Sequence, residues 1–522
     1  MFPQLKWQPL GDSALITECA EPAGLALQLR ARCPEECLDV VASYHHLAVY
    51  FTPLNSTIIA EWLREFTFSE KPREPRHHHL PVWYDPDWLT EVAEQLKKSP
   101  QEIVELHSSA DFTVAALGFS PGFPYLTGLP PELQLPRKDT PVRLPAGTVA
   151  IAADQAGIYP NDSFGGWHPL GLTSASLFDP YQEPHTLFEP GDQVCFKPLA
   201  DRPPINPSSV TGEPRERNGR EIAIVESSGP ATSIQSRGRV GYRHLGITPG
   251  GSCDPEMRSA LNLLLKNSPD APVLEFALEA PVIRFLDHAK VAFLGPQHSQ
   301  AGQVFEVQKG TILDLRSHPM QCSFGMLAIS GGFAVSEILG SPSTDLRGNF
   351  GGQVVQSGES LFQSSEATSF CSSKNPIIRW PLLSSNSLTI RVLPGEQSDW
   401  FSHALSESTF QKSARFDRTA AQLAGEPLEQ TIIKELTSRP ILAGAIQVPP
   451  DGTPTVLLSE CQTIGGYPII AHVISADLPA LARAKQGTQI HFKTVTLTEA
   501  RRAYELAQRE LAFLSTGLIL AE

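Results

Sequence analysis

Apolar residues at helical spacing mark several helices in the first hundred positions. Within segment 55–66 they share one face: Ile58, Ile59, Trp62, Leu63 and Phe66. Segment 87–98 has the same spacing, and Ser99 to Glu102 then fits a capping box with Pro100 at the first helical position. Residues 1–79 alternate strand-like pieces with helix-like ones such as 55–66 and are predicted to form a small α+β domain, and the two later helices follow it.

From residue 112 onward the apolar runs become short and are separated by Gly and Pro. Runs such as TVAALGF, GTVAIAA and DQVCFKP are typical of strands in a barrel or sandwich. A polar segment rich in Pro and charged residues follows. It shows neither helical nor strand periodicity, so it is the predicted linker. Beyond it the strand texture returns twice, on either side of WPLLSSNSL, and Thr496 with Glu499 fits a capping box before a closing helix.

These patterns predict a fold that is mainly β with α+β, divided into four domains. A chain of 522 residues is also too long for a single hydrophobic core. The predicted boundaries are 1–79 for the α+β domain, 80–199 for the first β domain, 200–221 for the linker, 222–384 for the second β domain and 385–522 for the third with its helix.

Charge and cysteine content narrow the class of partner. A net charge of -15 argues against a nucleic-acid surface, because phosphate contacts need clustered Lys and Arg. The eight cysteines are scattered without a Cys-x-x-Cys pair, which predicts reduced thiols. The first residues show no basic stretch before an apolar run, and no apolar run reaches membrane-spanning length. We therefore expect a cytoplasmic protein that binds small molecules or other proteins, with no membrane partner.

Gly118 to Gly122 matches the Gly-x-Ser-x-Gly pattern of a hydrolase nucleophile elbow. In that motif the residue after the serine donates its backbone N–H to the oxyanion, but Pro121 has no N–H to donate. The segment also lacks the strand-turn-helix pattern that the motif requires. We interpret GFSPGFPYLTGLP as a shaped Gly/Pro loop whose backbone approaches a ligand closely.

Two kinds of segment are candidates for binding anions. Arg137 and Arg143 could hold a carboxylate or phosphate as a fork, and a solvated basic turn explains them equally well. Segments 157–168 and 462–468 each combine a glycine pair with aromatic and polar residues. Such loops present backbone N–H donors, although ordinary β turns have the same composition.

The histidines give weaker indications. His107 falls at the end of a predicted helix, where a general base could project and where the helix dipole also favours a cation. His77, His78 and His79 have no second ligand cluster at fitting spacing, so we predict a solvated loop and no structural metal. No Gly-x-x-x-x-Gly-Lys-Ser/Thr loop and no kinase signature are present, so any ATP site is an unusual one.

Several ordered strings resemble a known pair of protein families. GDSAL, GFSPGFPYLTGLP, PAGTVAIAADQAGIYP and GGWHPLG are similar to the B subunit of 5-oxoprolinase, also described as allophanate hydrolase subunit 1 or as a sporulation-kinase inhibitor. After the linker, SSGPATSIQSRGRVGYRHLGITPGGSCDPEM, GSPSTDLRG and GAIQVPPDGTPTVLLSECQTIGGYP resemble the C subunit, related to allophanate hydrolase subunit 2. The same modules resemble the carboxyltransferase region of urea carboxylase. The resemblance implies cyclophilin-like β barrels, one in the B module and two in the C module.

The chain departs from the family at two places. The C subunit usually has Arg-Met-Gly near an Asp-Arg pair, whereas this chain continues from Asp417 and Arg418 with Thr-Ala-Ala-Gln. Ser236 to Arg239 also lacks the acidic residue that tends to precede the family's Gly-Arg pair. These departures leave the identity of the substrate open.

The resemblance implies ATP-dependent opening of 5-oxoproline, with Mg²⁺ accompanying the ATP. The B and C modules would phosphorylate the lactam, and a separate 5-oxoprolinase A subunit would complete hydrolysis to glutamate. The candidate catalytic residues are His107, Arg143, Arg239, Asp254 and Glu275. The candidate substrate- or nucleotide-binding residues are Phe119, Pro121, Gly122, Tyr125, Arg137, Tyr159, Gly165, Gly166, Trp167, Gln235, Ser343, Thr344, Asp345, Gln447, Gln462, Thr463, Gly465, Gly466 and Tyr467.

Two other functions remain open at this point. One is carboxyl transfer to urea or a related amide, for which the biotin carrier would be separate because no Met-Lys-Met motif is present. The other is regulation of a sensor histidine kinase by the B module. The homo-oligomeric state is also open. We expect the site at an interface between modules, because ligand sites favour domain junctions.

Overall fold

The computed structural model describes residues 5–69, 74–204, 219–352, 354–364, 386–402 and 405–520, with side chains as far as Phe513. We call residues 5–204 the N-terminal module and residues 219–520 the C-terminal module. The segment 205–218, most of the predicted linker, lies outside the described residues.

The N-terminal module begins with a four-stranded antiparallel sheet, the N-terminal sheet. Helix α2 (Ser56–Glu65) confirms the helix predicted from segment 55–66; Ile59 and Leu63 are buried on its inner face, whereas Ile58 is exposed. A second helix, α1 (Pro22–Arg30), packs on the same sheet. The strands, in the order β1-β2-β4-β3, are β1 (Gln8–Leu10), β2 (Ala14–Glu18), β3 (Cys37–Ser43) and β4 (His46–Phe51).

A closed seven-stranded barrel, the first barrel, follows. Helices α3 (Pro86–Leu96) and α4 (Pro100–Ser109) pack on it, and α4 begins with the predicted capping box, in which Ser99 and Glu102 bond reciprocally. Ser43 pairs with Ala116, so the N-terminal sheet is continuous with the barrel. The barrel strands are β5 (His77–Tyr84), β6 (Phe112–Leu117), β7 (Pro124–Thr127), β9 (Thr148–Ala152), β10 (Gln155–Ile158), β12 (His168–Leu172) and β13 (Gln193–Pro198); β8 (Val142–Leu144) and β11 (Ser163–Gly165) form a separate hairpin.

The first domain of the C-terminal module has two sheets rather than the closed barrel that was predicted, and we call it the two-sheet domain. Two single-residue bridges, Ser233 with Val354 and Phe333 with Gln363, extend the edges of these sheets. Helix α5 (Pro255–Leu264) packs beside them. The four-stranded sheet contains β14 (Arg220–Ser227), β17 (Val282–Phe285), β20 (Ile312–Asp314) and β22 (Ser360–Gln363); the other contains β15 (Ala231–Gln235), β16 (Val273–Ala277), β18 (Ala289–Leu294), β19 (Phe305–Val307) and β21 (Phe324–Ile329).

A second closed barrel completes the C-terminal module. Helix α6 (Leu478–Arg483) lies near it, and the long helix α7 (Leu497–Leu520) begins with the predicted capping box of Thr496 and Glu499. The strands of this second barrel are β23 (Ser387–Pro394), β24 (Thr409–Phe416), β25 (Ala420–Ala424), β27 (Ala445–Gln447), β28 (Thr455–Leu457), β30 (Ile469–Val473) and β31 (Gln489–Thr494).

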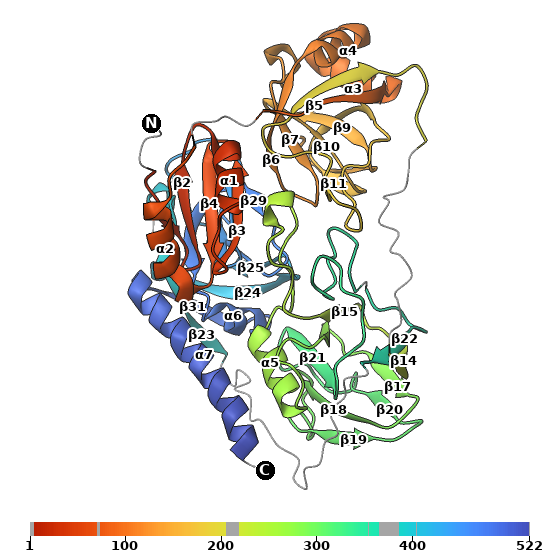
Figure 1. Ribbon diagram of the computed structural model, residues 1–522, viewed down its shortest axis with the longest axis vertical. Coiled ribbons are helices and arrows are strands. Elements are labelled where there is room, and N and C mark those ends of the chain that lie inside the picture. Colours follow the sequence, from red (N-terminus) through yellow and green to blue (C-terminus); the bar gives the residue numbers. More distant parts are fainter. Residues whose placement is uncertain are drawn as a thin grey trace.

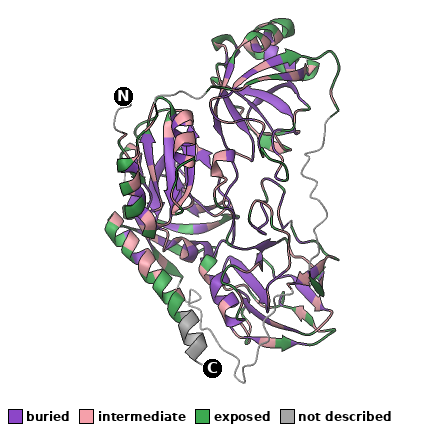
Figure 2. Cartoon of the chain, in the orientation of Figure 1, coloured by how far each residue is buried: buried purple, intermediate pink, exposed green. Residues whose placement is uncertain are grey.

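The four domains surround a central region of loops (Figure 1). The N-terminal sheet lies against the second barrel, although the two are at opposite ends of the chain, and helices α3 and α4 cover the outer end of the first barrel. Buried residues fill each domain and continue into the places where domains meet (Figure 2). Within the described residues, no helix combines the length and apolar character needed to cross a membrane.

Candidate functional site at the junction of the two modules

A two-stranded ribbon of the C-terminal module contacts both parts of the N-terminal module. The ribbon pairs β26 (Arg439–Pro440) with β29 (Ile464–Gly465). Ser43 Oγ donates to the carbonyl of Ser438 at 2.7 Å, and Tyr50 Oη donates to the carbonyl of Ile441 at 3.0 Å. These buried hydrogen bonds hold the ribbon against the N-terminal sheet.

Two buried aspartates of the N-terminal sheet strengthen this attachment. Asp39 accepts hydrogen bonds from the backbone N–H of Arg243 and from His244 Nδ1, the latter at 3.1 Å. Asp12 accepts from the backbone N–H of Ser475 at 2.9 Å and from its hydroxyl at 2.6 Å. Both carboxylates are therefore satisfied by the C-terminal module, and their role is to join the modules.

The loop between β6 and β7 brings the first barrel against the same ribbon. A Cβ on Gly118 would stand 2.3 Å from Ile464 Cγ1 and 3.4 Å from Thr463 Oγ1, so only glycine allows this approach. The loop joins strands β6 and β7, so it lacks the strand-turn-helix pattern of a nucleophile elbow.

The other side of this loop contacts the two-sheet domain. Gly122 donates its backbone N–H to Leu245 O at 2.9 Å, and Arg347 Nη1 donates to Phe119 O at 2.8 Å. A Cβ on Gly348 would meet Pro121 Cγ at 3.1 Å. Three domains therefore meet at the loop.

Five aromatic rings line the first barrel behind the loop, and we call them the aromatic cluster: Phe119, Phe123, Tyr125, Tyr159 and Trp167. Their ring centroids lie 4.9 to 6.0 Å apart in edge-to-face pairs. Ile464 of the ribbon packs in the same hydrophobic core.

The tyrosines of the cluster are hydrogen-bond donors at neutral pH. Burial raises the pKa of Tyr125 to about 12, although the charges of Arg137 and Arg347 oppose the shift. Burial also raises the pKa of Tyr159, with Tyr125 adding to the shift and Arg137 opposing it. Arg137 is exposed, and its charge acts to lower the pKa of both hydroxyls.

The second barrel and the residue before strand β29 contribute polar atoms that have no partner among the described residues. Thr463 Oγ1 and Gln447 Nε2 are buried, and neither has a hydrogen-bond partner in the part of the chain that the structure describes. A Cβ on Gly465 would lie 2.9 Å from Gln447 Nε2 and 3.5 Å from Gln462 Nε2, so both amides lie against a bare backbone. Buried polar groups without partners are uncommon, and they indicate a position for a ligand or water. The aromatic cluster and these atoms are the candidate site.

Two loops of the two-sheet domain hold a second polar group beside this site. The backbone N–H of Ser236 donates to Ser343 Oγ at 2.9 Å, and Gln235 Nε2 donates to Thr344 O at 3.3 Å. Asp345 accepts from the backbone N–H of Gly348 at 2.7 Å through Oδ1.

Asp345 is buried, and its Oδ2 has no partner among the described residues. Burial, and then the charge of Glu460, raises the pKa of Asp345 to about 6, while Arg239 lowers it. A carboxyl group of this kind changes its protonation close to neutral pH.

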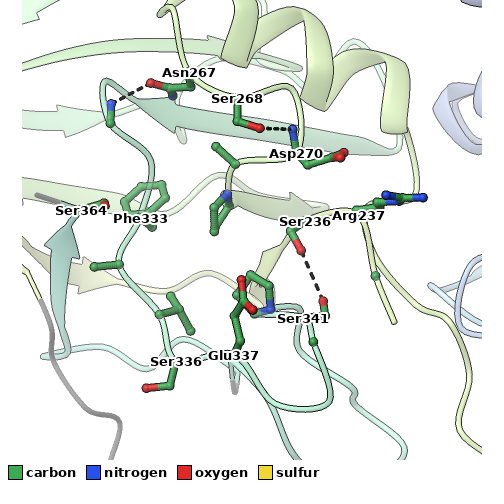
Figure 3. A pocket seen from close by; sticks show the side chains of 18 of the residues that line it. Ser236, Arg237, Asn267, Ser268, Asp270, Phe333, Ser336, Glu337, Ser341 and Ser364 are labelled. Carbon is green, nitrogen blue, oxygen red and sulfur yellow. Dashed lines mark hydrogen bonds between the residues drawn. The ribbon is translucent and has the colours of Figure 1, made fainter. Parts of the chain in front are cut away.

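Two cavities lie on either side of the loop 236–241. The larger has a volume of about 890 Å³ and is lined by Ser236, Arg237 and Gly238 from this loop. Figure 3 shows the hydroxyls of Ser236 and Ser341 facing each other in it, 3.4 Å apart. The smaller cavity, of about 290 Å³, is lined by the next three residues of the loop together with residues of the N-terminal sheet and second barrel.

Two of the predicted catalytic acids have structural partners instead. Asp254 accepts from Met257 N at the start of α5 and pairs with Arg483 Nε at 2.6 Å. Glu275 accepts from Cys253 N at 2.8 Å and pairs with Arg418. Their oxygens hold the two-sheet domain against the second barrel, so we assign them no proton-transfer role.

His107 and Arg143 also lie away from the candidate site. His107 is stacked on Phe196 in the core of the first barrel with Nδ1 2.7 Å from Tyr84 Oη, and burial lowers its pKa to about 3. Arg143 is exposed and pairs with Asp162 at 2.9 Å, so it does not form a fork with Arg137. The proton-handling role proposed for His107 is not supported by this position.

The other predicted binding residues differ in how deeply they are buried. A Cβ on Gly165 would meet Tyr159 Oη at 2.2 Å, and Lys138 donates its backbone N–H to Gly166 O. Tyr467 is exposed, and a Cβ on Gly466 would meet Leu436 O at 3.1 Å. The Gly465–Gly466 pair is therefore close to the amides, whereas Tyr467 lies on the surface.

Sequence reasoning missed several residues that build the junction, namely Asp12, Asp39, Arg347, Arg418 and Glu460. Arg418 bonds Glu460, Glu275 and Gly251 O, which links three separate segments. Arg418 stands in the Asp-Arg pair that had been noticed, and Arg347 follows Asp345 in GSPSTDLRG. The local strings contained both arginines, but Phe119 and Glu275, to which they donate, are each more than 100 residues away.

Among the described residues, no group of three or more His, Cys, Asp or Glu side chains could hold a metal ion. The prediction of a solvated loop at His77 to His79 was wrong, because these residues begin strand β5 of the first barrel. His78 Nε2 lies 3.1 Å from the buried Asp192 carboxylate, which also binds Arg76.

The two modules match two family models of one protein class. Residues 5–188 match the carboxyltransferase domain, subdomain C and D, and residues 245–494 match the carboxyltransferase domain, subdomain A and B. Both modules are thus those of a carboxyltransferase-domain protein.

Similar proteins indicate which carboxyltransferase-domain family the chain belongs to. The 5-oxoprolinase C subunit of Escherichia coli is 33% identical over 299 residues, which cover 54% of this chain and 94% of the relative. The 5-oxoprolinase B subunit of Haemophilus influenzae is 35% identical over 205 residues, covering 36% and 95%. A crystal structure of TTHA0988 superposes with a TM-score of 0.80 at 33% identity, covering 92% of this chain and 99% of that one. The chain belongs to the family of the B and C subunits of 5-oxoprolinase, with both kinds of module in one polypeptide.

Proposed function

We propose that this chain supplies the B and C functions of an ATP-dependent 5-oxoprolinase. It would phosphorylate the lactam of 5-oxoproline, and a separate A subunit would complete hydrolysis to glutamate in the cytoplasm. The main support is that both modules contribute to one site: the aromatic cluster comes from the N-terminal module, and the unpaired Thr463 and Gln447 come from the C-terminal module, as far as the described residues extend.

The chemistry of the site suits a small cyclic amide. The five-membered ring would pack on the aromatic cluster, and the unpaired Gln447 Nε2, together with the hydroxyls of Tyr125 and Tyr159, would donate to the lactam carbonyl. In the proposed step the lactam oxygen attacks the γ-phosphorus of ATP, the bond to the leaving ADP breaks, and the lactam N–H gives its proton to a base. Such transfers depend mainly on positioning and charge stabilisation.

We assign no residue to Mg²⁺ or to the nucleotide. The metal would arrive with the phosphates of ATP, which commonly supply most of its ligands together with water. The protein's own contribution in this proposal is to hold the lactam, exclude water from it and orient its oxygen.

Carboxyl transfer is the second candidate, and the family description supports it directly, because both matched models are carboxyltransferase domains. The acceptor would be urea or a related amide, and a separate biotin carrier would bring the carboxyl group. The same aromatic cluster and amide donors could bind such an acceptor. Regulation of a sensor histidine kinase remains an outcome of the test rather than a proposal.

Phosphate release from Mg-ATP by the purified chain, with and without 5-oxoproline and the A subunit, tests the proposal. We expect release that depends on both additions. Tyr159→Phe should reduce it at least tenfold, whereas Tyr84→Phe, in the core of the same barrel, is the matched control and should leave the rate within twofold. Absence of release under every combination would refute phosphorylation and favour carboxyl transfer or regulation.

A further inference from the structure

A loop of the two-sheet domain, residues 338–351, contacts the N-terminal module beside the aromatic cluster. Its Arg347 Nη1 donates to Phe119 O at 2.8 Å, and the guanidinium carbon lies 5.8 Å from the centroid of the Phe119 ring. Its Phe350 ring packs against Phe178, with the ring centroids 5.5 Å apart. Both contacts join the loop to the N-terminal module, and the first reaches a residue of the aromatic cluster.

Phe119 has a backbone conformation that is uncommon for an aromatic residue. Its φ is +64°, in the left-handed region, where the Cβ atom is crowded by the backbone. Such a conformation persists only where the surrounding contacts hold it. Arg347 provides one of these contacts, because its charged group donates to the carbonyl of Phe119 itself. In this conformation the Phe119 ring lies 5.3 Å from Phe123 and 6.0 Å from Tyr159, so the contact acts on the placement of a ring in the candidate site.

Arg239 holds the loop from the inside. Its Nε donates to Ile338 O at 3.1 Å, and its Nη2 donates to the carbonyls of Ser341 and Ser343. Its guanidinium carbon also lies 4.6 Å from the centroid of the Phe350 ring. The residue is 2% exposed, and its Nη1 is buried as well, so Arg239 has no surface for a substrate. Its contacts indicate that it shapes the loop and does not hold the anionic group that was predicted for it.

The turn that carries Arg347 extends from this part of the loop. Asp345 N donates to Phe350 O at 2.9 Å, and Phe350 N donates to Asp345 O at 3.3 Å, so residues 346–349 form a tight turn. Because the Phe350 ring packs on Arg239, the position of the turn depends on the arginine behind it. Arg347 is half-buried at the end of this series of contacts, whereas Arg239 is enclosed at its start.

We propose that Arg347 is a positioning residue that holds Phe119 in the aromatic cluster, with Arg239 acting behind it by fixing the loop. The hydrogen bond crosses from the C-terminal to the N-terminal module, so contact between the modules completes the cluster. The effect of Arg347 on turnover rests on the proposed function, whereas the placement of Phe119 can be measured without it.

A nitrile probe tests the placement of Phe119 directly. In the full chain with 4-cyanophenylalanine in place of Phe119, we expect one narrow nitrile stretching band in the infrared spectrum. Arg347→Met should shift or broaden this band while the circular dichroism stays unchanged, and Arg239→Met should have the same effect on the band. The matched control is Arg316→Gln, which removes an exposed ion pair with Asp314 on the same domain and should leave the band unchanged. An unchanged band in Arg347→Met overturns the proposal, whether or not Arg239→Met folds.

Chemical rescue separates positioning from stability in the turnover assay. Arg347→Ala should lower kcat/KM for oxoproline-dependent phosphate release at least tenfold, and added guanidinium should restore part of it by donating to Phe119 O in the vacated space. Guanidinium weakens folded proteins, so a variant that had only lost stability would become less active. Turnover of Arg347→Ala at the wild-type rate, or without rescue, would contradict the positioning role.

The two readouts also separate this role from the proposed function. If the nitrile band responds to Arg347→Met but the wild type releases no phosphate, the proposed function fails and the placement of Phe119 by Arg347 stands. If the wild type releases phosphate and neither readout responds to the loss of Arg347, the proposed function stands and the positioning role fails.

Discussion

The core of the first barrel and the junction between the modules each bury a nitrogen base, with opposite consequences. His107 lies among Phe112, Phe196 and Tyr84, and its Nε2 has no partner among the described residues, but it is neutral because burial lowers its pKa to about 3. Arg239 is equally buried and keeps its charge, because the pKa of arginine stays above neutrality in proteins.

Burial of a titratable group is therefore a poor guide to function by itself. A histidine can enter an apolar core as an uncharged ring, and the fold loses little at neutral pH. An arginine whose only hydrogen-bond partners are carbonyl oxygens remains a buried charge without a counter-ion, which is unfavourable. The difference directs attention from the barrel core to the junction.

The largest expected effect is the loss of stability when low pH forces a proton onto the buried His107. Between pH 6.5 and about 3, the unfolded chain binds one more proton at this histidine than the folded chain, so stability falls as the pH falls. The shift corresponds to roughly 4 to 5 kcal/mol at its limit. His107→Leu should remove most of this pH dependence, measured by hydrogen exchange of first-barrel amides. The exposed His77→Asn is the control, and an unchanged slope in His107→Leu would contradict the assignment.

The contact between modules can be tested by overpacking it. Gly118→Ala places a methyl group 2.3 Å from Ile464 Cγ1, which should cost about 1 to 3 kcal/mol by overpacking. In an Ile464→Ala background the same change should cost less than half as much, because the clashing carbon atoms are gone. Chemical denaturation of the four proteins gives the coupling, and additive costs would show that the loop does not press on the ribbon.

Local features of the fold were predictable from the sequence. Both capping boxes depend on residues three positions apart, and the helix at 55–66 depends on spacing within one segment. The structure also confirms that Gly118 to Gly122 form a loop between two strands. This was predictable locally, because Pro121 has no N–H to donate to an oxyanion.

The long-range features were not predictable in the same way. Ser43 and Ser438 are 395 residues apart, and Arg347 is 228 residues from Phe119, so no local pattern indicates these partners. The expectation of three barrels was wrong for the two-sheet domain, because short strands with glycine turns look alike whether or not a barrel closes. The predicted acids Asp254 and Glu275 are tied to arginines from other segments, which their own strings could not reveal.

The smallest expected effect comes from the capping box of α4, a structural feature away from the junction between the modules. Ser99 Oγ accepts from Glu102 N at 3.3 Å, and the Glu102 carboxylate accepts in return from Ser99 N at 2.7 Å, on the outer side of the first barrel. Ser99→Ala removes one half of this box and should cost about 1 kcal/mol. Denaturation measures that loss. Because α4 lies outside the aromatic cluster, oxoproline-dependent phosphate release should stay within twofold of wild type; a tenfold loss would show that the stability of the first barrel, rather than the aromatic cluster, controls turnover at the junction.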